Sequence, residues 1–235
     1  KRMSTLVIVL LSAIGLVGVT LLFIFVLMPM FRYNQATRLL EQYQFDESIA
    51  IFESLGDYKN SPEMVKEATY QKAGDLLNQG KYDEAIDIFT SLGDFKDSTE
   101  MIREANYRMA KELLLGEEFE QAITLFGSLL DYKDSAELQK EAKYLFAKQY
   151  LEDEEYFYAS GMFMELGEYK DAAELLVQSN YFLALLYYQN GLFEMALELL
   201  ATNPDYEETA LYAGLANTML RIQGTWENDT HNRQF

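Results

Sequence analysis

Four near-copies of one short segment decide the fold of this chain. They are LGDYKNS at 55–61, LGDFKDS at 92–98, LLDYKDS at 129–135 and LGEYKDA at 166–172. Successive copies begin 37 residues apart. Self-similarity at a fixed period of this size indicates a repeat protein, in which each repeat is one supersecondary element.

Four further columns of residues keep the same spacing of 37. The first two are Tyr33, Tyr70, Tyr107, Tyr144 and Tyr181, and Ala36, Ala73, Ala110, Ala147 and Ala184. The other two are Phe45, Tyr82, Phe119, Tyr156 and Phe193, and Phe52, Phe89, Phe126, Phe163 and Leu200. Five repeats of 37 account for 185 of the 235 residues.

Each repeat is predicted to form two helices. One helix is expected over about Ser98–Leu115, where apolar residues recur at steps of three and four, and a second over about Phe119–Leu129. Asp97, with Glu100 three residues later, suggests a capping box at the start of the first helix, and the pairs at Asn60, Asp134 and Asp171 repeat it. Gly56, Gly93 and Gly167 follow second helices, where a left-handed C-terminal cap favours glycine.

A two-helix repeat of this size buries its apolar face only against neighbouring repeats. The predicted fold is therefore all-α: a right-handed solenoid of five helix pairs plus a capping helix. We expect the solenoid over 33–222, with repeats starting near Tyr33, Tyr70, Tyr107, Tyr144 and Tyr181 and the capping helix at 208–222. Residues 223–235 leave the repeat pattern and are interpreted as a tail or the start of a further domain.

The N-terminal region is predicted to anchor the chain in a membrane. Residues 6–31 form a run of 26 without a charge, long enough to cross a hydrocarbon core of about 30 Å as a helix. Residues 1–32 are therefore predicted to be a single-pass transmembrane anchor. Lys1 and Arg2 precede the run and Arg32 and Arg38 follow it, so flanking charge does not decide the orientation. We favour a cytoplasmic N-terminus and an extracytoplasmic repeat domain, since the chain has no cysteine.

The repeats resemble tetratricopeptide repeats. The stretch GKYDEAIDIF, residues 80–89, has small, large and aromatic residues at the places of that pattern. The period of 37 exceeds the usual one by three residues, and the long period with the GDYKDS turn resembles a group of bacterial membrane-anchored proteins. The resemblance implies protein or peptide binding and no enzymatic activity.

The resemblance also implies a candidate groove lined by first helices. Carried over by alignment, it consists of three sets: Tyr70, Tyr107, Tyr144 and Tyr181; Leu77, Leu114 and Leu151; and Glu67, Glu104 and Glu141. Tyrosine offers rigid amphipathic contact area for a bound segment. However, a tyrosine present in every repeat also suits packing between repeats, and this recurrence favours packing, because a specific groove normally differs from repeat to repeat.

Composition excludes several classes of function. The net charge of −19 argues against nucleic-acid binding, which needs clustered Lys and Arg. With no cysteine and one histidine, thiolate and histidine metal sites are excluded, and the paired carboxylates of the turns are too few ligands for Ca²⁺. No catalytic motif, phosphate loop, cofactor site or small-molecule substrate site is predicted.

The sequence thus predicts a non-enzymatic, membrane-anchored scaffold that binds a protein or peptide. The acidic surface favours a basic partner. Two alternatives remain: a rigid spacer that presents a further C-terminal domain, and an appendage of an enzyme whose catalytic domain lies outside this sequence.

Overall fold

The computed structural model describes the backbone of residues 5–129 and 131–232, and the side chains of residues 13–129 and 131–224. Every regular element in these ranges is helical. The chain divides into two compact units, Lys1–Met109 and Ala110–Phe235, called here the N-terminal and the C-terminal unit. Each unit is described by itself.

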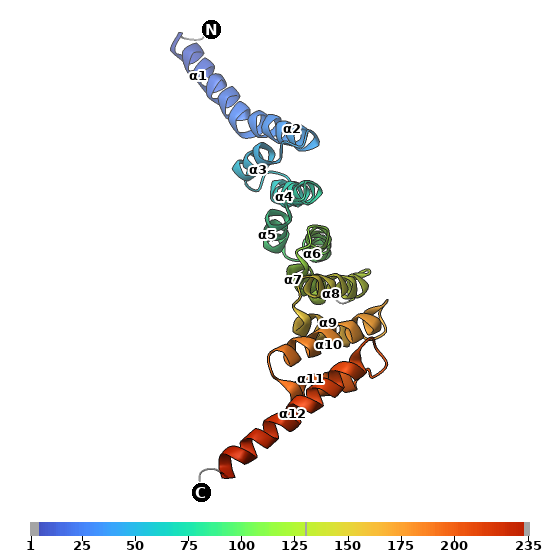
Figure 1. The fold of residues 1–235 in the computed structure, drawn as a ribbon. Coiled ribbons are helices and arrows are strands. Elements are labelled where there is room, and N and C mark those ends of the chain that lie inside the picture. The colour runs from blue at the N-terminus through green and yellow to red at the C-terminus, as the bar shows by residue number, and fades with distance from the viewer. Residues whose placement is uncertain (1–4, 130, 233–235) are drawn as a thin grey trace. The chain divides into compact units, whose positions relative to one another are not determined.

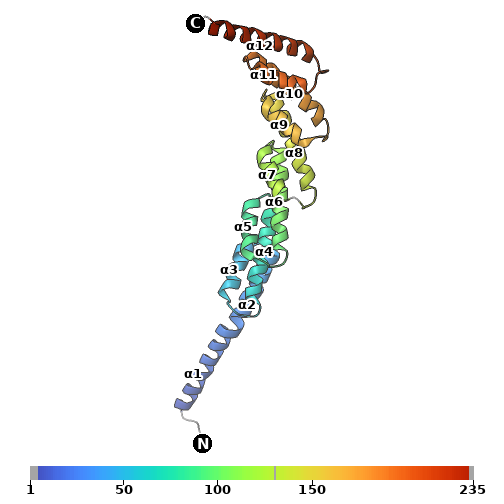
Figure 2. The same ribbon diagram turned by 90° about the horizontal axis from the view of Figure 1, so that it is seen from below.

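The N-terminal unit is a succession of helices stacked in chain order (Figures 1 and 2). α2 packs on α3, α3 on α4 and α4 on α5. The helices are α1 (Thr5–Leu22), the π-helical turn η1 (Phe23–Leu27), α2 (Met28–Glu41), α3 (Phe45–Ser54), α4 (Ser61–Asn78), α5 (Tyr82–Leu92) and the first part of α6 (Ser98–Leu115).

The C-terminal unit repeats the same arrangement. From α7 to α12 each helix packs on the next, and α10 also contacts α12. The helices are α7 (Phe119–Ser128), α8 (Ser135–Glu152), α9 (Tyr156–Leu166), α10 (Ala172–Gln189), α11 (Phe193–Ala201) and α12 (Thr209–Asn232). Long first helices thus alternate with short second helices, which confirms the predicted all-α chain of helix pairs.

Most element boundaries agree with the sequence prediction, and two differ. α6 has the predicted bounds, and α7 ends one residue before the expected Leu129. The expected division at 32/33 falls inside α2, so the apolar segment and the first helix of the first repeat are continuous. The last helix does not stop at 222 but continues to Asn232, because no helix-breaking proline follows Ile222. Residues 233–235 of the expected tail lie outside the described part.

Columns of small residues let the helices approach closely. The residues of these columns are at most 3% exposed. They are Ala36, Ala73, Ala110, Ala147 and Ala184; Ser48, Ala85, Ala122, Ala159 and Ala196; Ser61, Ser98, Ser135, Ala172 and Thr209; and Ala68, Ala105, Ala142, Ser179 and Ala216. The Ser48 hydroxyl donates to the Ala36 carbonyl at 2.9 Å, a contact that a larger residue at either place would prevent. Phe52, Phe89, Phe126 and Phe163 fill the space beside these columns and are fully buried.

The turns between helices have positive backbone φ at recurring positions. Gly56, Gly93 and Gly167 have the expected positive φ, at 55°, 57° and 59°. The ψ of Gly93 and Gly167 is −126° and −118°, so these two caps are not the predicted left-handed helical ones, although they still need a φ that glycine adopts without strain. A second column carries lysine, as at Lys96 and Lys170, both with φ of 51°. A non-glycine residue in this conformation costs roughly 1–2 kcal/mol, so the lysine side chain must contribute compensating contacts.

The N-terminal helix is apolar and exposed. Among the described side chains, the helix Ala13–Glu41 is the one long and apolar enough to cross a membrane, with a mean hydropathy of 2.5 and none of that apolar window buried. η1 precedes Pro29, which has no N–H to continue the regular hydrogen-bond ladder, and the amide of Met28 donates to the carbonyl of Phe23 instead.

Candidate functional site

The tyrosine column lies at the junctions between successive helix pairs. Tyr107, Tyr144 and Tyr181 are buried, and Tyr70 is half-buried. At each junction resolved inside one unit, the tyrosine contacts the turn that follows the second helix. The tyrosine side chain therefore makes its contacts within the chain. Binding of a partner by this column stays a prediction.

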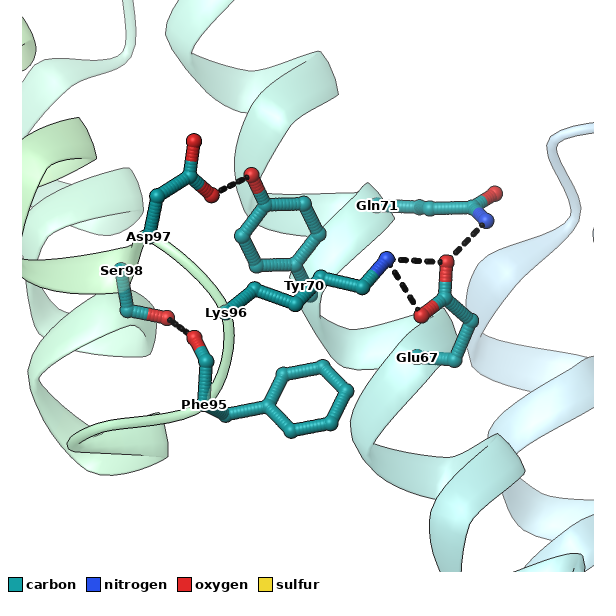
Figure 3. A network of polar contacts seen from close by, with 7 residues as sticks. All are labelled: Glu67, Tyr70, Gln71, Phe95, Lys96, Asp97 and Ser98. Atoms are coloured by element: carbon teal, nitrogen blue, oxygen red, sulfur yellow. Dashed lines mark hydrogen bonds and ion pairs between the residues drawn. The ribbon is translucent and has the colours of Figure 1, made fainter.

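One junction in the N-terminal unit joins α4 to the turn before α6 (Figure 3). The Tyr70 hydroxyl donates to Asp97. Lys96 lies over the Tyr70 ring, 4.7 Å from its centroid, and its Nζ is 2.6 Å from a carboxylate oxygen of Glu67. Gln71 donates to the same carboxylate at 2.8 Å. The left-handed lysine thus bridges a ring and a carboxylate, which explains why lysine occupies a strained position.

The C-terminal unit contains a matching junction between α8 and the turn before α10. The Tyr144 hydroxyl donates to Asp171 at 2.6 Å. Lys170 lies 4.7 Å from the Tyr144 ring centroid and pairs with Glu141. Tyr169 donates its hydroxyl to Glu141 at 2.8 Å, in the role that Gln71 has in the other junction. The two junctions, which lie two repeats apart in the sequence, therefore share the same arrangement of polar side chains.

This environment shifts the pKa values of the groups involved. Burial, followed by the hydrogen bond to Asp97, raises the pKa of the Tyr70 hydroxyl to about 12. For Tyr144 the hydrogen bond to Asp171 is the larger cause, and its pKa also rises to about 12. Burial acts to raise the pKa of Glu67, but the hydrogen bonds from Lys96 and Gln71 and the charge of Lys96 lower it overall. These shifts have structural causes and do not indicate an acid–base catalyst.

The junctions correct the predicted capping boxes. Asn60, Asp134 and Asp171 do stand at N-cap positions, but none of them makes a side-chain capping hydrogen bond. The Asn60 side chain instead accepts the hydroxyl of Tyr33 at 2.6 Å, as Asp171 accepts that of Tyr144. The preceding tyrosine competes for the side chain with the helix's own N–H groups, and sequence spacing alone does not reveal this competitor.

The other residues of the candidate groove are placed as follows. Leu77 is buried in the core between α4 and α5, while Leu114 and Leu151 are half-buried. Glu104 has a side chain that is 15% exposed and lies 2.8 Å from Arg108, one turn along α6. Glu67 and Glu141 belong to the two junctions already described.

A surface groove of about 500 Å³ lies in the C-terminal unit, between α9 and α11 with α10 at its base. Its exposed apolar side chains include Phe157, Met164 and Met195. Leu183 and Tyr187 of α10 form part of the lining, together with small residues of α9. The groove was not predicted from the sequence, although α9 departs from the residue columns that the other second helices share.

Among the described residues, no group of three or more His, Asp or Glu side chains is arranged to hold a metal ion.

Comparison with known proteins adds little to these observations. Neither the known protein families nor the curated proteins include a match to this chain. Among solved structures, the TPR domain of P58(IPK) is 16% identical, with a TM-score of 0.31, over 87% of this chain and 68% of that one. The MamA RS-1 ArsTM double mutant is 16% identical, with a TM-score of 0.23, over 84% and 97%. The order and packing of this chain's own helices show an all-α helical-repeat protein built of sequential helix pairs.

Proposed function

We propose that this chain is a membrane-anchored, non-enzymatic scaffold that binds a protein or peptide. The observation that carries the proposal is the contrast between two kinds of surface residue. Side chains that recur in every repeat, such as Tyr70 and Tyr144, are used to join the helix pairs. The apolar side chains at the groove of the C-terminal unit do not recur and remain exposed, as an interaction surface requires.

Anchoring is supported by the N-terminal helix. Its apolar residues are exposed, and the helix enters the first repeat without a break, so the repeats would stand directly on the membrane. A secretory signal has the same location and composition, so anchoring needs its own test. The proposed orientation places the N-terminus inside and the repeats outside.

The absence of cysteine from the chain makes a topology test direct. Leu115→Cys places one thiol at a side chain that is 82% exposed. In intact cells expressing the full chain, a membrane-impermeant maleimide should label this variant as fully as it does after lysis, and the protein should sediment with membranes after an alkaline wash. Labelling only after lysis would reverse the orientation, and release by the wash would refute anchoring.

Binding is tested by a photo-crosslinking amino acid at Met164, with the same group at Tyr43 as the control. Both side chains are highly exposed, at 67% and 74%, but only Met164 lines the groove. The scaffold proposal expects one protein to be captured from Met164 and not from Tyr43.

A rigid spacer is the second candidate function. The near-identical junctions favour a regular stack of helix pairs, and in a spacer the length of the stack, not its surface, determines function. Capture at neither position, together with full function after deletion of one 37-residue repeat, would establish the spacer instead.

A further inference from the structure

Helix α9 differs from the other second helices at the residues that face the groove. Phe157 stands where the other repeats have Asp46, Asp83, Glu120 and Glu194, and Tyr158 stands where three of them have Glu47, Glu84 and Gln121. Packing between repeats does not require the change, since α3 packs with acidic residues at both places. A residue type that is confined to one helix of a repeat protein points to a local function.

The place of Phe157 carries an acidic residue in the other repeats. Between α3 and α4 that residue is Asp46, and Lys72 binds it at 2.6 Å. The place of Lys72 is apolar in all later repeats, where it holds Met109, Phe146, Leu183 and Leu220, so the missing acidic residue is the change particular to α9. Phe157 and Leu183 both line the groove, where Phe157 is 65% exposed.

Other replacements hollow the groove. Isoleucine at the places of Ile49, Ile86 and Ile123 becomes Ser160, whose hydroxyl donates to Asn180 at 2.6 Å. The next residue is Gly161, and a Cβ built there meets nothing within 4 Å. Glycine in a helix interior costs roughly 0.5–1 kcal/mol relative to alanine, and no close neighbour requires it here. The space above Gly161 is thus open and available to a ligand side chain.

The surroundings of the groove are strongly acidic. Between residues 149 and 220 the sequence has thirteen Asp and Glu and one basic residue, Lys170, which is paired with Glu141. Glu165 and Glu198 belong to the lining itself, and Glu165 is paired with Lys143 of α8 at 2.9 Å. Charge complementarity therefore selects a cationic occupant. Met162, Met164 and Met195 add flexible, polarizable side chains that adapt to apolar groups of different shape.

We infer that the groove between α9 and α11 binds a short cationic segment of a partner protein, which places large apolar side chains over Gly161 and a Lys or Arg side chain near Glu198. The inference rests on the proposed scaffold function and names the site and the chemistry of the partner. The apolar side chains supply affinity by burial, and the basic ones supply the rate of encounter and the discrimination against acidic segments.

The test uses the full chain in phosphatidylcholine nanodiscs and a displayed library of random twelve-residue peptides, with empty nanodiscs for counter-selection. Enriched sequences should combine net positive charge with at least two large apolar residues. Synthetic versions should bind, by fluorescence anisotropy, at least tenfold more weakly when NaCl rises from 50 to 500 mM, since screening weakens exposed charge pairs.

Gly161→Leu is the decisive variant, because Gly161 lines the groove and a Cβ there meets nothing within 4 Å. It should weaken peptide binding at least tenfold while leaving the circular dichroism spectrum and melting temperature intact. Gly74→Leu makes the same change in α4, at a glycine that is equally free of neighbours, and should leave binding unchanged.

The outcomes separate the inference from the function on which it rests. Enriched peptides that bind Gly161→Leu as well as the native chain, or that are acidic, would overturn the groove assignment and leave the scaffold proposal standing. No enriched peptide, together with no crosslink from Met164, would overturn both. A phospholipid retained by the native chain and lost from Gly161→Leu, with no peptide selected, would also overturn the inference.

Discussion

The hydroxyl of Tyr144 provides a sharp test of the junction between helix pairs. Tyr144→Phe keeps the ring, which packs on Phe163 and Tyr169 and lies under Lys170, and removes only the hydrogen bond of 2.6 Å to Asp171. Hydrogen bonds to charged groups contribute about 1.5–3 kcal/mol, and here the exposed carboxylate regains water when the hydroxyl is lost. We therefore expect a loss of about 1–2 kcal/mol in the free energy of unfolding.

A double-mutant cycle with Asp171→Ala isolates this contribution. Asp171→Ala alone also removes an N-cap residue, and the cycle cancels that effect. Urea unfolding of the full chain in detergent micelles, followed by circular dichroism, should give a coupling energy of about 1–2 kcal/mol between the two substitutions.

The control is Tyr158→Phe in the same unit, at a side chain that is 56% exposed, and it should cost less than about 0.5 kcal/mol. A coupling energy below about 0.3 kcal/mol, which is within the error of additivity, would refute the reasoning. The tyrosine column would then stabilise the junction through its rings alone.

Three further predictions concern the core and the junctions. Phe126→Ala should cost about 3–5 kcal/mol, because this ring is fully buried, whereas Leu115→Ala at an exposed site should cost little; a similar shift of the urea midpoint for both would be inconsistent with the core assignment. Ala110→Leu should overpack a fully buried position and cost about 1–3 kcal/mol, and an unchanged melting temperature would show that the helices do not approach closely there. The raised pKa values of Tyr70 and Tyr144 stabilise the neutral hydroxyls, so this contribution is present below pH 10 and is lost as the pH rises through about 12. The melting temperature should fall between pH 10 and about 12. The double variant Tyr70→Phe/Tyr144→Phe should show a smaller fall in melting temperature over the same pH range.

Local patterns in the sequence predicted most of the secondary structure. The period of 37 placed α6 at Ser98–Leu115 and predicted alternating long and short helices. Glycine at 56, 93 and 167 predicted a positive φ after the second helices, because glycine adopts this φ without strain. Such features depend on residues within one or two turns of each other, which is why one sequence suffices.

The polar side chains could not be assigned in the same way. Asp97 has the spacing of a capping residue, yet it accepts a hydrogen bond from Tyr70, 27 residues earlier. Lys96 likewise reaches Glu67 across the junction. From the sequence alone, a local capping contact and a contact across the junction are equally plausible for such a side chain. The packing of α4 beside the next turn decides which contact forms.

By itself, then, the sequence determined the repeat, the helix pairs and the buried small and aromatic columns, because periodic burial leaves a periodic pattern. Tertiary structure decided which side chains are used in contacts between helices and which remain exposed. The sequence left the tyrosine column open to either packing or a groove, with packing favoured, and the hydrogen bonds of Tyr33 and Tyr144 to the next turn show which contacts these side chains make. The residues of α9 that differ from the other second helices could be interpreted only from the tertiary structure, in which α9, α10 and α11 form a groove at Gly161. A groove requires surfaces from separate helices, and the sequence alone does not show how these surfaces meet.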